Sequence, residues 1–337
     1  MFSIICLLIT LSLGIGSQLA AAEARAAAPD PYARPHQLVE IGAGRKLNLY
    51  CIGHGVPTVV FDADAGAPGW DWLLVQPAIA KRTQSCVYDR AGLGFSDPSN
   101  RPGTSANAVE DLNALLAAAG LKPPFILVGE GYGGMNVQLY AYRYPTDVIG
   151  LVLVDAQHED EVARFDQLTD GKFSPLLLAV NIGFLKDCAA AAEAGFVPGS
   201  KIPADCVGSQ LQDRQSFGPT LTETARHLFA TAPHWAANFS EESNLPVSAD
   251  QLRSARTSFG DRPVVYLTRG ISPYRIPGQP QSETNKAVEQ AVKAMHDEIA
   301  GLSAHGSNRV VRGAGHDIQL DRPKAVIDAV GLALKAQ

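Results

Sequence analysis

Short apolar segments alternate along the chain with segments of helical spacing, and this alternation restricts the fold more than any other feature. Apolar runs rich in β-branched or aromatic residues predict strands at residues 47–51, 58–61, 85–88, 125–128 and 149–154. Helical spacing of apolar residues lies between them, at 70–81, 106–119 and 135–144. Strands that alternate with helices in this way predict an α/β fold with a mostly parallel sheet and helices on both faces.

The alternation is interrupted once. Residues 156–260 show helical segments without a convincing strand, and strand and helix patterns then return at 262–267, 285–302, 309–311 and 323–335. A helical insertion explains this better than two tandem domains. We therefore expect one core, residues 36–155 and 261–337, with residues 156–260 inserted as a helical cap.

The N-terminal residues predict export. Residues 4–16 are an apolar run, and the small residues Ala20, Ala21 and Ala22 follow as a cleavage signal. The run falls short of the roughly 20 residues that span a bilayer. We expect residues 1–22 to be a signal peptide, and the alternative is that they form an uncleaved N-terminal anchor. Residues 23–35 are expected to be a leader, and ordered structure is expected to start near His36. Because no later apolar run is expected to reach the length of a membrane helix, the protein is predicted to be secreted or periplasmic, without membrane contact after signal cleavage.

Cysteine number agrees with export. The chain has five cysteines, and loss of Cys6 with the signal leaves four: Cys51, Cys86, Cys188 and Cys206. An even number in an exported protein favours disulfides, although the sequence alone allows three pairings. A C-x-x-C spacing is absent, so no metal site is predicted.

The charge balance limits the partners. The net charge is −6, with 28 Lys plus Arg against 34 Asp plus Glu, and 46% of residues are hydrophobic. A mildly acidic chain with few charged residues is neither a nucleic-acid binder nor disordered. We expect a small-molecule substrate or ligand, with no nucleic acid and no cofactor.

A strand, a glycine-rich turn and a helix follow one another at FILVGEGYGG, residues 125–134. The layout matches the nucleophile elbow G-x-S-x-G, in which a strained turn lifts the nucleophile above the sheet. The nucleophile position is Gly131, which has no side chain that could attack a carbonyl group. Glu130 is expected to point into the fold. The neighbouring glycines are expected to leave room for a serine side chain at position 131.

Four motifs in a fixed order carry a family resemblance. YDRAGLGFSD at 88–97, the elbow, LVLVDA at 151–156 and GAGH at 313–316 together resemble the α/β-hydrolase superfamily over roughly residues 36–335. The resemblance is to esterase and lactonase members, with the elbow serine replaced by Gly131. It implies an α/β-hydrolase fold and an activity on small carboxylic esters or lactones.

The resemblance also implies the catalytic histidine and acid. His316 matches the late histidine, and the segment TRGISPYR at 268–275 offers no carboxylate at the usual acid position. Asp155, at the end of the preceding strand, is the best alternative, because a carboxylate there can fix the histidine tautomer. Asp317 ranks below it. Asp155 could instead cap a helix or serve the cap hinge, and His316 could be an ordinary loop histidine.

The oxyanion hole is expected from two segments. The backbone N–H of Tyr132 follows the elbow, and the loop at 62–66 would supply Ala65 and Gly66. Asp62 and Asp64 lie in the same loop, and their charge would oppose an oxyanion unless both side chains point away.

The family's usual strand order further implies the disulfides. It makes the strands that carry Cys51 and Cys86 neighbours, while Cys188 and Cys206 flank one loop of the cap. We therefore expect the pairs Cys51 with Cys86 and Cys188 with Cys206.

Three other functions compete with a serine hydrolase. His316 and Asp155 could act as a base pair without a nucleophile, or the protein could be a pseudoenzyme that binds a small apolar ligand without turnover. Gly129, Gly131 and Gly134 also match the dinucleotide fingerprint G-x-G-x-x-G. That fingerprint normally lies on the first βα unit, whereas at least two strands precede it here. We therefore rank a dinucleotide-binding oxidoreductase last.

Overall fold

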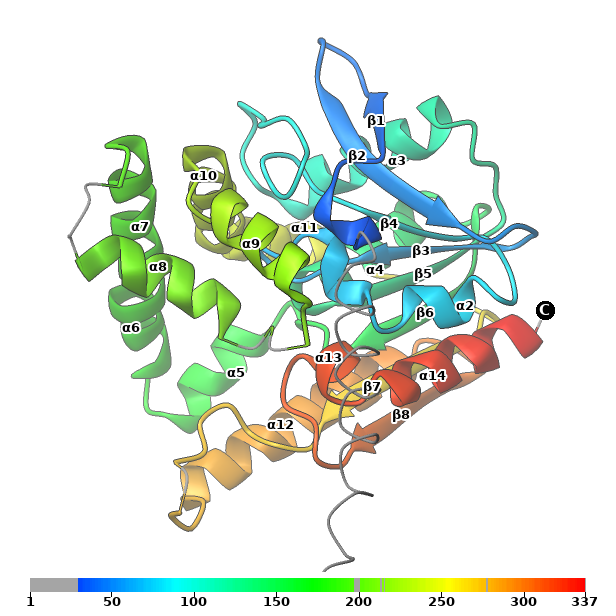
Figure 1. Cartoon of the computed structure of the whole chain (residues 1–337). Coiled ribbons are helices and arrows are strands. Elements are labelled where there is room, and N and C mark those ends of the chain that lie inside the picture. Colours follow the sequence, from blue (N-terminus) through cyan, green and yellow to red (C-terminus); the bar gives the residue numbers. More distant parts are fainter. Residues whose placement is uncertain (1–29, 197–200, 213, 215, 277, 337) are drawn as a thin grey trace, which may run out of the picture.

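A computed structural model describes residues 30–196, 201–212, 214, 216–276 and 278–336 (Figure 1). In this part of the chain eight strands form one sheet in the order β1-β2-β4-β3-β5-β6-β7-β8. The β1–β2 and β2–β4 pairs are antiparallel and the others are parallel. The strands are β1 (Gln37–Glu40), β2 (Lys46–Ile52), β3 (Thr58–Asp62), β4 (Ser85–Tyr88), β5 (Phe125–Glu130), β6 (Val148–Val154), β7 (Val264–Arg269) and β8 (Gly306–Val311).

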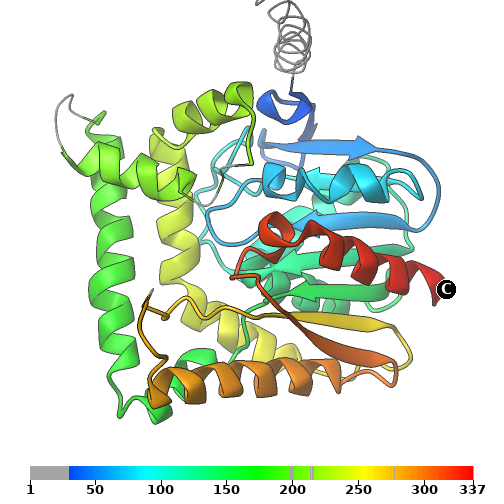
Figure 2. The same cartoon turned by 60° about the horizontal axis from the view of Figure 1, so that its bottom comes forward.

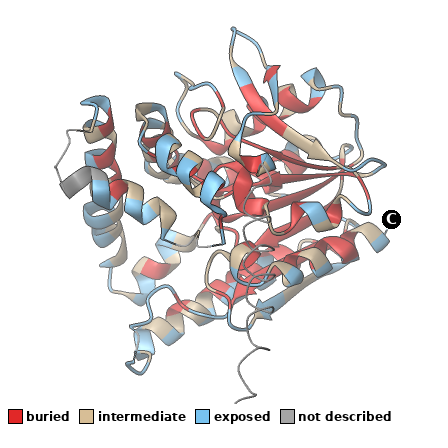
Figure 3. Ribbon diagram, in the orientation of Figure 1, coloured by how far each residue is buried: buried red, intermediate tan, exposed pale blue. Residues whose placement is uncertain are grey.

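The central strands are the ones that the sequence predicts most clearly. Every residue of β3, β4, β5 and β7 is buried, because helices cover both faces of the sheet (Figure 3). Such strands read as continuous apolar runs. The edge strand β1 escaped prediction because only Val39 among its four residues is buried. The predicted α/β fold with a mostly parallel sheet is confirmed.

Helices cover the two faces of the sheet (Figure 1). On one face lie α3 (Ser105–Ala118), α4 (Gly131–Arg143) and α12 (Glu283–Ala300). On the other lie η2 (Gly69–Trp72), α2 (Gln76–Ile79) and α14 (Pro323–Lys335), with the short α13 (Ile318–Asp321) before α14. The helix predicted at 70–81 is divided into η2 and α2. Pro77 at the start of α2 explains the break, since proline cannot continue a helix that begins before it.

The segment between β6 and β7 forms a helical layer beside the sheet (Figure 2). Its described residues contain helices and no strand of the sheet. The elements are α5 (Glu161–Leu168), α6 (Phe173–Leu177), the π-helical turn η3 (Leu178–Ile182), α7 (Gly183–Glu193), α8 (Lys201–Leu211), α9 (Pro219–Leu228), α10 (Ala232–Ser243) and α11 (Leu245–Ala255). We call this segment the cap.

One cap segment corrects an expectation from the sequence. The continuous helix Phe173–Glu193 is long and apolar enough to cross a membrane, judged by length and composition alone. The expectation that no segment after the signal would qualify is therefore wrong. Small and apolar side chains are frequent in this helix, and its charged residues are few.

Ordered structure starts within the segment expected to be a leader. The turn η1 (Pro31–Ala33) precedes His36, and its Tyr32 is buried. The Tyr32 hydroxyl donates to Gln76 Oε1 at 2.8 Å, which ties this turn to α2. The expected signal peptide at 1–22 lies outside the described residues.

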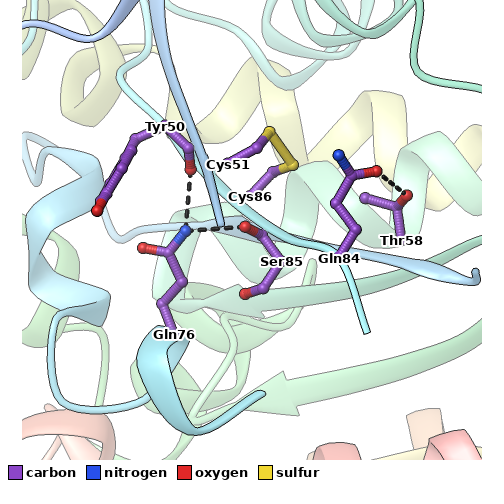
Figure 4. The surroundings of a disulfide bond; sticks show 7 residues. All are labelled: Tyr50, Cys51, Thr58, Gln76, Gln84, Ser85 and Cys86. Atoms are coloured by element: carbon purple, nitrogen blue, oxygen red, sulfur yellow. Dashed lines mark hydrogen bonds between the residues drawn. A yellow bond between two sulfur atoms is a disulfide. The ribbon is translucent and has the colours of Figure 1, made fainter. Parts of the chain in front are cut away.

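Both expected disulfides are present. Cys51 and Cys86 are direct register partners on the antiparallel strands β2 and β4, with Cα atoms 4.1 Å apart (Figure 4). Beside them, Gln76 Nε2 donates to two strand carbonyl groups, as Figure 4 shows. Cys188 on α7 pairs with Cys206 on α8 at a Cα separation of 5.8 Å. Two disulfides fit an oxidising compartment.

Candidate active site

The turn between β5 and α4 has the geometry of an elbow. The strand ends at Glu130 and the helix begins at once with Gly131, whose φ of +48° lies in the left-handed region. Glycine adopts this conformation without steric cost. The Gly131 carbonyl oxygen accepts a hydrogen bond from the backbone N–H of Gln157 at 3.0 Å. Position 131 therefore lies at the carboxyl edge of the sheet, under the cap.

Asp155 and His316 meet at this edge. Asp155 follows β6, His316 lies in the loop after β8, and His316 Nδ1 is 2.7 Å from Asp155 Oδ2. The backbone N–H and the guanidinium of Arg269 each donate to the same carboxylate at 3.0 Å. Burial would raise the pKa of Asp155, but His316 and Arg269 outweigh it, so this pKa lies below its usual range. Asp155 is thus an ionised acceptor fixed beside the imidazole.

The second ring nitrogen of His316 faces another carboxylate. His316 Nε2 is 3.1 Å from Oδ2 of Asp64, which lies in the loop after β3. Burial would lower the pKa of His316, but hydrogen bonds to Asp155 and Asp64 outweigh it and raise this pKa well above its usual range. His316 therefore holds its proton between two carboxylates at neutral pH.

The Asp64 carboxylate occupies the space above Gly131. A Cβ atom built on Gly131 would overlap Oδ1 and Cγ of Asp64. The backbone N–H of Tyr132 donates to the same Oδ1 at 2.7 Å. The expectation that the turn leaves room for a serine side chain is therefore wrong, because a side chain from another loop already fills that room.

The expected oxyanion donors are all engaged. The Tyr132 N–H and the Ala65 N–H both donate hydrogen bonds to the Asp64 carboxylate. The Gly66 N–H donates to Glu241 Oε2 of the cap helix α10 at 2.8 Å. Burial would raise the pKa of Asp64, but His316 and these backbone donors outweigh it and lower this pKa. The Asp64 carboxylate is therefore an anion, and it occupies the oxyanion hole that we expected to bind the oxyanion of a substrate.

The other aspartate of the loop does turn away. Asp62 Oδ1 accepts from Arg90 Nη1 at 2.6 Å, and its Oδ2 accepts from the Tyr88 hydroxyl at 2.8 Å. Arg90 also donates to Glu241 Oε1 at 2.7 Å through Nε. Arg90 therefore links the loop after β3 to the cap. Sequence reasoning missed this role, although Arg90 lies within the motif at 88–97.

This buried network gives a stability prediction. Replacing Arg90 by methionine leaves the Asp62 and Glu241 carboxylates buried without their cation, which costs about 3–5 kcal/mol. Urea unfolding should show this loss. Arg226→Met is the matched control, because Arg226 pairs with Glu223 and both side chains are more than half exposed, where pairs contribute about 1 kcal/mol or less. Equal small losses in both variants would contradict the role given to Arg90.

A cavity of about 440 Å³ lies under the cap beside the elbow. Its wall contains Met135 of α4, Gln157 and residues of the cap, and the apolar ones among these include Leu177, Leu178, Ile182 and Leu245. Glu161 and Glu242 also line it. Burial, with Asp64 adding to it, raises the pKa of Glu242 to about 8, while burial raises that of Glu161 to about 7. These two carboxyl groups are thus partly protonated near neutral pH, and Asp166, Asp250 and Arg253 also lie in the wall.

Glu130 lies beneath the elbow as expected. It is fully buried, and neither carboxylate oxygen has a hydrogen-bond partner among the described residues. Burial, followed by the charge of Asp317, raises its pKa well above the usual range. Glu130 is therefore a neutral acid.

The partner of His316 Nδ1 is Asp155, the residue that we ranked first, and not the adjacent Asp317.

Comparison with known proteins agrees with this geometry. The model of the alpha/beta hydrolase family matches residues 52–329, so the chain belongs to this family. The uncharacterized protein YqjL of Bacillus subtilis is 37% identical over 98 residues, which are 29% of this chain and 39% of that relative. The chain thus spans well under half of that relative.

Solved structures share the fold at low identity. A putative acyltransferase from Salmonella enterica superposes with a TM-score of 0.67 at 18% identity, over 89% of this chain and 94% of that one. The enol-lactonase from Burkholderia xenovorans LB400 superposes with a TM-score of 0.57 at 16% identity, over 89% of this chain and all of that one. These likenesses concern the fold.

Proposed function

We propose that this protein is an exported hydrolase of small carboxylic esters or lactones, in which Asp155 and His316 move the proton. The observation that carries the proposal is the 2.7 Å contact of His316 Nδ1 with Asp155 Oδ2, which leaves Nε2 directed at the elbow tip. Gly131 stands where the family's serine would, so the attacking group must come from elsewhere.

Asp155 and His316 have complementary roles. Asp155 accepts from Nδ1, fixes the tautomer of the ring and stabilises its cation. His316 then takes or gives a proton at Nε2, the atom that faces the reacting group. Arg269 keeps Asp155 ionised and in position through two hydrogen bonds.

The substrate class rests on the cavity and on the relatives. A volume of about 440 Å³ lies within the range of roughly 300–1,000 Å³ that small-ligand pockets have. The apolar part of its wall, which includes Leu177, Leu178 and Ile182, suits a substrate with a hydrocarbon body. The enol-lactonase among the structural neighbours acts on a lactone, as its name states, which favours a small ester or lactone here.

Export is part of the proposal. The apolar run at 4–16 and the small residues at 20–22 predict a signal peptide, and the two disulfides support an oxidising destination. Edman sequencing of the secreted or periplasmic protein should begin at Glu23. Retention of residues 1–22 would favour an uncleaved anchor.

The geometry disfavours a dinucleotide. A diphosphate would have to lie at the N-terminus of α4. The Tyr132 N–H there already serves the Asp64 carboxylate, and a second anion at the same place would be repelled.

Hydrolysis assays on the purified chain test the proposal. We expect turnover of short p-nitrophenyl esters or small lactones, and His316→Ala should lower it by about a hundredfold to ten-thousandfold because the proton carrier is lost. His305→Ala is the matched control, since His305 is exposed and precedes β8, at the opposite end of that strand from the loop that carries His316. Ligand-induced stabilisation without turnover would identify a binding protein instead. Equal activity in both variants would contradict the role of His316.

A further inference from the structure

We propose that Asp64 supplies the missing nucleophile, and that its carboxylate opens a strained oxygen ring by attack on a saturated ring carbon. The inference rests on the proposed function, because it uses the same histidine and acid. It narrows the lactones of the proposed function to β-lactones and adds epoxides, because both rings have a saturated carbon that bears a strained C–O bond.

The first support is position. The elbow exists to hold a nucleophile at its tip, beside the histidine and the following backbone N–H. The Asp64 carboxylate overlaps the place of a side chain on Gly131, lies 3.1 Å from His316 Nε2 and accepts from Tyr132 N–H. Residue 131 has no side chain, and the Asp64 side chain from the loop after β3 occupies the place that such a side chain would take.

The second support is rigidity. The Asp64 carbonyl oxygen accepts from Arg90 Nη2 at 2.6 Å and from the Ala67 N–H at 2.9 Å. Its carboxylate is held by Tyr132 and His316. Backbone and side chain are therefore both fixed, as a reacting group requires. The side chain is nevertheless 27% exposed, so a substrate can reach it.

The third support selects the kind of carbon attacked. The N–H groups of Tyr132 and Ala65 engage Asp64 itself, and Gly66 N–H engages Glu241. No expected donor is left for an oxyanion on a substrate carbonyl, whereas attack on a saturated carbon forms no such oxyanion. The same donors can instead stabilise an oxyanion that forms later at Asp64 Oδ1, when water attacks the Asp64 ester.

The first step consumes the ionised Asp64 and the protonated His316. An oxygen of Asp64 forms a bond to the saturated ring carbon, and the bond from that carbon to the ring oxygen breaks. The ring oxygen takes the bonding pair and the proton of His316 Nε2. The products are an Asp64 alkyl ester, carrying a new hydroxyl or carboxyl group on the opened substrate, and a neutral His316.

The second step restores the site. Esterification removes the charge of Asp64, so His316 holds its proton less strongly and can act as a base. His316 takes a proton from water, and the hydroxide adds to Asp64 Cγ with the resulting oxyanion held by Tyr132 N–H and Ala65 N–H. Collapse expels the alkoxide, which takes the proton of the added hydroxyl. The product is a diol from an epoxide or a hydroxy acid from a lactone, and Asp64 is again ionised beside protonated His316.

A single turnover in heavy-oxygen water tests the inference. Enzyme in excess is mixed with styrene oxide in one arm and β-butyrolactone in the other, and the peptide containing Asp64 is examined by mass spectrometry. We expect one heavy oxygen atom in Asp64 and the original oxygen in the product, in at least one arm. Asp317→Asn is the matched control, a neighbouring carboxylate outside the mechanism, and should keep the label at Asp64.

Variants separate the inference from the proposed function. Asp64→Asn, which keeps the shape of the side chain, should remove turnover. With β-butyrolactone, whose carboxylate leaving group needs no proton, His316→Gln should accumulate the alkyl ester on Asp64, whereas opening of styrene oxide should slow because its alkoxide loses the proton donor. Hydrolysis by the parent with an unlabelled Asp64 would overturn the inference and leave the proposed function intact. An adduct on Asp64 without release would support the inference and contradict turnover. Failure of the parent to hydrolyse or bind covalently any ester, lactone or epoxide would overturn both.

Discussion

Combining Asp64→Ala with Gly131→Ser is expected to create a serine that reacts with a fluorophosphonate probe, from no labelling in the parent to stoichiometric labelling. The Asp64 substitution empties the space above the turn and frees the N–H groups of Tyr132 and Ala65. His316 Nε2 then faces the new hydroxyl and can accept its proton. Gel fluorescence with intact-protein mass spectrometry measures the outcome.

The single variants are the controls for this result. Gly131→Ser alone forces a side chain into the Asp64 carboxylate, so we expect no labelling and a destabilisation of about 1–3 kcal/mol. His316→Ala in the double variant should abolish the labelling. Labelling of Gly131→Ser as strong as that of the double variant would show that Asp64 does not fill the elbow. Labelling of the parent would point to another serine.

Asp155→Asn is expected to lower turnover by about ten-thousandfold, because an amide can hold the ring in the wrong tautomer and cannot stabilise its cation. The side chain keeps its size, so the fold should persist. Steady-state assays on the substrate found for the parent measure the loss.

Glu289→Gln is the matched control for this prediction. Glu289 is the other partner of Arg269, at 3.1 Å, and does not touch His316. Its loss should leave turnover close to that of the parent. A comparable fall in both variants would mean that Asp155 acts only by holding Arg269.

The sequence predicts the strands of the core well, because the apolar residue pattern of each strand agrees with its burial between two layers of helices. Every residue of β3, β4, β5 and β7 is buried and their central residues are apolar, because helices cover both faces of the sheet. Prediction is weaker where a strand is mostly exposed or where a proline interrupts a helical pattern. β1 has only one buried residue, and the helix at 70–81 is divided at Pro77.

The candidate site is only partly readable from sequence. Gly131, Asp155 and His316 follow strand ends, so their meeting at one edge follows from the topology. Asp64 was noted only as a charge that should point away. Whether a loop side chain turns toward the elbow depends on space, and that space exists because residue 131 is a glycine. The Asp64 side chain can enter the elbow only because residue 131 has no side chain. A dependence of this kind between two separate loops leaves no local pattern in the sequence.

Titration of His316 by NMR tests the central claim, that this ring lies between Asp155 and Asp64 at the elbow. We predict that the ring nitrogens of the parent report a pKa well above the usual range of histidine, because both carboxylates stabilise the cation. Asp64→Asn should lower this pKa while leaving the Nδ1 contact with Asp155 in place. A His316 that titrates near its ordinary value in the parent, and does not respond to Asp64→Asn, would contradict the account.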